Sequence, residues 1–273
     1  MNKGLLLFLI LLLSYQPVLV LTAAPEWLVF KGKHFLVYYL EDAEFAKEVC
    51  RQAEKSYHKI ASDLGFRKHD HFWIWENRVK IYIYRDRNVF IRDTHAPQWA
   101  SGKANHETME IATYLNSRSF IDSVLPHEIT HLIFRDFMRF EDHVPLWLNE
   151  GVAQWEEKDR SSSVQRMMPE LLTRNRFIPL GELVKMDIRT VKDSGTAAQF
   201  YAQSISLVGY MIGEHGSTKF RKFCGQLRDG KDLNDALRFT YPATIRNIGE
   251  LEARWKKNQL RGQQKRIREK LIK

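Results

Sequence analysis

The chain is organised around the stretch SFIDSVLPHEITHLIFRDFM, residues 119–138. His127 and His131 are four positions apart, so on a helix both imidazole rings project from one face and can bind one metal ion. This is the spacing of a zinc site. Glu128 follows the first histidine and can reach a water on the metal as a general base. The segment therefore predicts a helix that carries a zinc centre.

A catalytic zinc site usually has three protein ligands and a water, so two histidines leave it incomplete. The segment LNEG, residues 148–151, offers Glu150, and a carboxylate is a known third partner for two histidines. An H-E-x-x-H string arises by chance in roughly a few per cent of chains of this composition. The alternative is a buried helix with hydrogen-bonded histidines. Burying His127, His131 and Glu128 without a partner is costly, which disfavours that alternative.

Together, HEITH (residues 127–131) and WLNEGVAQW (residues 147–155) resemble the gluzincin metallopeptidases of the peptidase MA-like family. They are also similar to the matching segments of aminopeptidase N-type enzymes. The resemblance implies a zincin-like fold in which His127, His131 and Glu150 bind Zn²⁺ and Glu128 activates the water.

The resemblance also implies a tyrosine at the start of a later helix that stabilises the oxyanion, which nominates Tyr201 in QFYAQS, residues 199–204. A phenol can donate this hydrogen bond while it stays neutral. A tyrosine that only packs is the alternative.

In gluzincins an edge strand before the metal helix pairs with extended substrate, and Ala104 to Thr113 has the length for this role. A peptide or protein would then bind by strand addition, with backbone bonds supplying affinity and alternate side chains supplying selectivity. Met109-Glu110 only faintly resembles the aminopeptidase strand that binds a free amino terminus, so an aminopeptidase is not inferred.

Strand patterns come first in the chain and helix patterns second. Residues 28–40, broken by Lys-Gly-Lys, predict a strand or a hairpin, and residues 79–84 predict a strand that Phe90–Arg92 extend. Between them, a helix capped by Asp42 is expected to end at Gly65. The helices expected later are 164–174, interrupted near Pro169, then the Tyr201 helix to about Gly213, 217–230, 233–239 and 248–255, with a loop at 179–181. We therefore expect an α+β domain over residues 25–251, with an N-terminal mixed sheet and helices, a mainly helical C-terminal part and the cleft between them.

Residues 1–24 have the layout of an export signal. Lys3 precedes the apolar run from Gly4 to Leu13, and small residues follow at 22–24. A cleaved signal predicts an exported protein, periplasmic or secreted. An uncleaved N-terminal anchor is the alternative, because residues 4–24 are just long enough to span a bilayer.

The basic character of the chain belongs to a C-terminal tail, residues 252–273. The tail holds nine Lys and Arg residues against two Glu residues, a net of +7 out of the +9 of the whole chain. It could contact an anionic envelope surface, but a solvated helix end is the favoured interpretation because few apolar residues accompany the charges. The aromatic interleaving typical of nucleic-acid platforms is missing, which argues against a nucleic-acid partner.

The remaining metal-ligating residue types carry no clear signal. Cys50 and Cys224 could form a disulfide or stay as two buried thiols. The other eight histidines, His34, His58 and His106 among them, lack ligand-like context.

The function predicted from the sequence is hydrolysis of peptide bonds by a zinc metallopeptidase. A dormant zincin-fold binding or scaffolding protein of the cell envelope is the alternative, and zinc-dependent hydrolysis of a non-peptide amide is a third possibility. The intact Glu128 favours an enzyme, because a purely structural zinc site needs no general base and closes its fourth position with a side chain.

Overall fold

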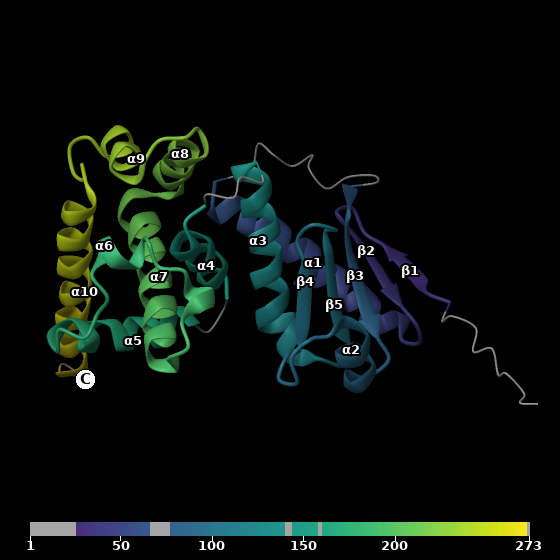
Figure 1. The fold of residues 1–273 in the computed structure, drawn as a ribbon. Helices are drawn as coiled ribbons and strands as arrows, with labels where there is room; N and C mark the ends of the chain where they lie inside the picture. The colour runs from purple at the N-terminus through teal and green to yellow at the C-terminus, as the bar shows by residue number, and fades with distance from the viewer. Residues whose placement is uncertain (1–25, 66–76, 140–143, 158–159, 272–273) are drawn as a thin grey trace, which may run out of the picture.

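A mixed sheet forms the N-terminal side of the computed structural model, which describes residues 26–65, 77–139, 144–157 and 160–271 (Figure 1). Its strands are β1 (Leu28–Lys31), β2 (Phe35–Tyr39), β3 (Val79–Tyr84), β4 (Gly102–Asn105) and β5 (Glu110–Tyr114). They lie in the order β1-β2-β3-β5-β4, with β2, β3 and β5 parallel and the outer strands β1 and β4 antiparallel to their neighbours. The expected strands at 28–40 and 79–84 are confirmed. The expected export signal, residues 1–24, lies outside the described residues.

Alternation along β3 separates the two faces of the sheet. The buried side chains of β3 are Val79, Ile81 and Ile83, and they share one core with the apolar face of helix α1 (Ala43–Asp63). This helix begins at the expected place, because the Asp42 side chain accepts a hydrogen bond from the Phe45 backbone N–H and satisfies one free donor of the first turn.

The opposite face of the sheet is partly covered by helix α2 (Arg87–Thr94). Phe90 of this helix packs in a small second core with Tyr84 and Tyr114. The expectation that Phe90–Arg92 extend the strand region is therefore wrong. Asp86 starts a helix instead, because its side chain accepts hydrogen bonds from two backbone N–H groups of the first turn.

The segment Ala104–Thr113 is a hairpin and not the single edge strand that we expected. The Asn105 side chain accepts hydrogen bonds from the backbone N–H groups of Glu107 and Thr108, which turns the chain after β4. As a result β4 is the outer strand at this edge of the sheet, and β5 lies between β3 and β4.

Helices make up the second part of the molecule, as expected (Figure 1). They are α3 (Leu125–Met138), α4 (Leu146–Trp155), α5 (Arg160–Thr173), α6 (Leu180–Leu183), α7 (Ser194–His215), α8 (Ser217–Arg228), α9 (Leu233–Thr240) and α10 (Ile248–Leu271), with a π-helical turn at Phe120–Val124 and a 3₁₀ turn at Ile188–Thr190. α3 stands between the sheet and the other helices and packs against α1 and α4. α7 is the centre of the helical part, in contact with α4, α5, α8 and α10.

Two local expectations in the helical part are wrong. Residues 179–181 lead into the short helix α6 where we expected a loop. Pro169 does not interrupt α5, which runs across it. A proline inside a helix removes a hydrogen bond and costs about 3 kcal/mol, and the packing of α5 against α7 and α10 outweighs this cost.

Helix α10 crosses residue 252, at which we placed the start of the basic tail. Leu251 and Trp255 are fully buried, and the Trp255 indole N–H donates to Ser206 Oγ at 3.0 Å on α7. The first turns of the basic segment are therefore anchored in the helical core. Among the described residues, no helix has the length and apolar character needed to cross a membrane.

Both cysteines are buried free thiols, Cys50 on α1 and Cys224 on α8. Burial, with a smaller contribution from Glu54, raises the pKa of Cys50 to about 11, and burial also raises the pKa of Cys224. Both side chains therefore remain protonated and weakly nucleophilic at neutral pH.

Candidate metal centre

Helix α3 presents the HEITH segment from a buried position. Pro126 lies in the first turn, where a proline is tolerated because its missing N–H would have no helical partner. The fully buried side chains Ile129 and Leu132 fix one side of the helix in the core. His127 and His131 share another side, one turn apart.

Helix α4 carries Glu150 and is held close to α7. At Gly151, a Cβ atom would lie 2.6 Å from the backbone oxygen of Ser204, so only glycine allows the two helices to approach this closely. The position after Glu150 therefore determines how near α4 comes to the centre of the helical part.

The structure brings together the three residues nominated as metal ligands. One ligand atom from each of His127, His131 and Glu150 lies within 4.8 Å of the other two. The Nε2 atoms of the two histidines are 3.0 Å apart, and His131 Nε2 is 3.9 Å from Glu150 Oε1. Two imidazole nitrogens and a carboxylate oxygen are the donor set of a catalytic zinc site, so these residues fit such an ion.

The Nδ1 atom of each histidine has its own partner. His127 Nδ1 lies 2.8 Å from Glu157 Oε1, and Ser123 Oγ donates to the second oxygen of Glu157 at 3.0 Å. His131 Nδ1 lies 3.1 Å from Asn149 Oδ1. Partners of this kind fix the ring orientation of metal-binding histidines, and here they leave both Nε2 atoms facing the centre.

Burial sets the charges of the group. Burial, and then the neighbouring His127, lowers the pKa of His131 to about 4, so this ring is neutral at pH 7 with a lone pair available to a cation. Burial alone would lower the pKa of His127, but Glu157 and the other nearby carboxylates raise it above the usual value. Burial raises the pKa of Glu150 above its ordinary range.

Glu128 lies beside a histidine that the sequence interpretation set aside. His106 Nε2, on the turn between β4 and β5, is 3.5 Å from Glu128 Oε2, and its ring meets that of His131 edge to face at 5.5 Å. Burial would raise the pKa of Glu128, but His106, His127 and His131 together lower it below the usual value. His106 has no ligand-like context in the sequence, and in the structure it lies beside Glu128 and is not one of the three grouped ligand residues.

Tyr201 lies within α7, the helix that packs against α4. It is well past the first turn and not at the helix start that the resemblance implied. Its half-buried ring contacts Phe200 edge to face at 5.6 Å. Its role as an oxyanion donor stays a prediction.

Sequence reasoning missed Glu157, Asn149 and His106 as partners of the group. Glu157 lies two residues past the end of α4, so helical spacing did not connect it with the site. Asn149 lies inside the quoted motif. His106 had no local signal, because only the fold of the β4–β5 hairpin brings it over α3.

Comparison with known proteins places the chain in a family. The family model described as Peptidase MA superfamily matches residues 53–261, which is more than half of the chain and runs from α1 to α10. The match includes every residue of the candidate metal centre. Among curated proteins, none matches this sequence closely.

Proposed function

We propose that this chain, which belongs to the Peptidase MA superfamily, is a zinc-dependent metallopeptidase that hydrolyses peptide bonds. The observation that carries the proposal is the pair of histidine Nε2 atoms 3.0 Å apart, each ring held by a partner at Nδ1, with Glu150 beside them. His127, His131 and Glu150 would hold the ion. When bound, zinc supplies a Lewis acid for the scissile carbonyl and lowers the pKa of its water to about 7.

The general base in this proposal is Glu128. Glu128 follows the proposed ligand His127 in the chain, and its side chain is largely buried. In this position its carboxylate can take a proton from the attacking water and pass it to the departing amine. His106 lies close enough to orient this carboxylate. Tyr201 is proposed to donate a hydrogen bond to the oxyanion, as the family resemblance implied.

We further propose that extended peptide adds to β4, an outer strand of the sheet that leads directly to His106 beside Glu128. A surface hollow lined by Tyr82, Tyr84 and Lys103 lies beside this strand and offers space for alternate side chains. N-methylation of successive amides in a cleaved peptide should weaken binding at every second position. An equal loss of binding affinity at all positions, or no loss at any position, would contradict strand addition.

The decisive experiment compares the wild-type chain with Glu128→Gln on a peptide library, with and without a chelator. Loss of the general base should lower kcat by about 10²–10⁴-fold while the zinc content is unchanged. Glu44→Gln, an exposed position on α1, is the matched control and should behave like the wild type. Full turnover by Glu128→Gln, or cleavage that no chelator inhibits, would overturn the proposal. Zinc binding by a wild-type chain that cleaves no peptide would favour the dormant binding protein.

A further inference from the structure

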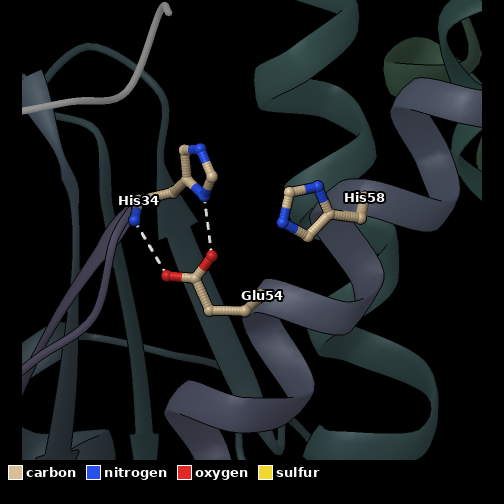
Figure 2. A group of neighbouring side chains, drawn as sticks. All are labelled: His34, Glu54 and His58. Carbon is tan, nitrogen blue, oxygen red and sulfur yellow. Dashed lines mark hydrogen bonds and ion pairs between the residues drawn. The ribbon is translucent and has the colours of Figure 1, made fainter. Parts of the chain in front are cut away.

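A second group of metal-ligating side chains lies on α1 and the turn between β1 and β2. It consists of His34, Glu54 and His58, and one ligand atom from each lies within 4.8 Å of the other two. Glu54 and His58 are one helical turn apart on α1, and the His58 ring points toward the Glu54 carboxylate and the His34 ring (Figure 2). None of these residues takes part in the candidate catalytic group.

His34 and Glu54 are already held in place. The Glu54 carboxylate accepts a hydrogen bond from the His34 backbone N–H at 2.8 Å, and its second oxygen lies 2.6 Å from His34 Nδ1. The His34 ring is fully buried and stacks on Tyr57 at 4.0 Å. Gly32 makes room for this approach, because a Cβ there would lie 2.7 Å from Glu54 Oε1. Two of the three ligands are thus preorganised.

A packing role does not account for this histidine. Its Nε2 atom is buried and has no hydrogen-bond partner among the described residues, and leaving such an atom unpaired costs about 1–3 kcal/mol. An apolar side chain would fill the same space without that cost.

We propose that His34, Glu54 and His58 bind a second divalent ion of the zinc class. Two imidazoles and one carboxylate suit zinc better than Mg²⁺ or Ca²⁺, which prefer oxygen ligands. The ion takes the place of the proton between His34 Nδ1 and Glu54 Oε2, and that proton moves to His34 Nε2, so the neutral ring keeps one proton. Two ligand atoms of one tetrahedral zinc lie roughly 3.3 Å apart, so these two groups need to separate by less than about 1 Å.

The bound ion would link the β1–β2 turn to α1. It would thereby stabilise the contact between this outer hairpin and the helix that packs on one face of the sheet. Because His58 is exposed, water from solvent could reach the ion and supply a fourth ligand. The site is independent of the proposed peptidase activity, so either proposal can fail without the other.

The test is zinc titration of the metal-free full chain, followed calorimetrically. The wild type should bind two equivalents, and His58→Ala should bind one, with no unfolding expected because the residue is exposed. Lys55→Ala, at an exposed position on the same helix, is the control and should bind two. In a His127→Ala/His131→Ala background one equivalent should remain, and adding His58→Ala should remove it.

A direct readout covers the case in which the double variant does not fold. Cu²⁺ added to the wild type after the first zinc equivalent should show nitrogen hyperfine coupling from imidazole in its electron paramagnetic resonance spectrum, and His58→Ala should lose part of it. Zinc binding that is the same in the wild type and in His58→Ala would overturn the proposal, whereas a single wild-type equivalent that His58→Ala loses would count against the catalytic centre alone.

Discussion

At the scale of the residue, the side chain most open to test is Glu157. It touches no substrate in the proposed mechanism and acts through His127, whose Nδ1 lies 2.8 Å from its carboxylate. Loss of such a partner typically weakens metal affinity by about 10–100-fold. Glu157→Gln should show this loss in competition with a zinc chelator, and saturating zinc should restore most of kcat. Glu182→Gln, at an exposed position, is the control. An unchanged zinc affinity would show that Glu157 only fills space.

The amino-acid sequence alone was enough to predict some residues of the site but not others. His127 and His131 were predictable because four positions on one helix fix their relation. Glu150 was predictable because a site with two histidines lacks a third ligand and the LNEG segment follows the HEITH segment closely in the chain. His106 was not, because its place over Glu128 depends on a hairpin turn that the Asn105 side chain sets up. Local spacing therefore predicts ligands on one helix and misses partners that come from another element.

At the scale of the element, the approach of α4 to α7 positions Glu150. Gly151→Ala would place a methyl group 2.6 Å from the Ser204 backbone oxygen, and helix backbone cannot move aside as a flexible side chain can. We expect a loss of about 1–3 kcal/mol in the free energy of unfolding by urea, together with a lower kcat. Gly213→Ala is the matched control on α7, where a Cβ meets nothing within 4 Å. It should stabilise the chain by about 0.5–1 kcal/mol. Equal stability of the two variants would contradict the close-packing argument.

The elements that were predicted correctly from sequence share strong local signals. α1 has an Asp42 cap and a regular apolar face, and β3 is rich in the β-branched and aromatic residues that favour strands. The hairpin at 104–113 and the helix at Phe90 were misjudged for one reason. In both segments one side chain, Asn105 or Asp86, accepts hydrogen bonds from backbone N–H groups, and these bonds decide the structure over a strand-like composition.

At the scale of the whole molecule, an ion pair between α1 and the end of α4 connects the sheet side to the helical side. Lys59 Nζ on α1 lies 2.5 Å from Glu156 Oε2 at the end of α4. The Glu156 side chain is only 1% exposed, and its other oxygen has no hydrogen-bond partner among the described residues. Burial therefore outweighs the attraction of Lys59 and raises the pKa of Glu156 above its ordinary value.

A carboxyl group whose pKa is raised by folding binds its proton more tightly in the folded state. Its contribution to stability is greatest below the ordinary carboxyl pKa and is lost as the pH rises through the higher pKa of the folded state. Glu156→Gln cannot ionise, so its free energy of unfolding should fall less than that of the wild type across this window, measured by urea unfolding between about pH 4 and pH 8. Lys59→Gln should show the opposite change, a steeper fall, because Glu156 then ionises without a cation beside it. If both variants follow the wild-type pH dependence, Glu156 is not the group that titrates, and the contact between α1 and α4 depends on packing alone.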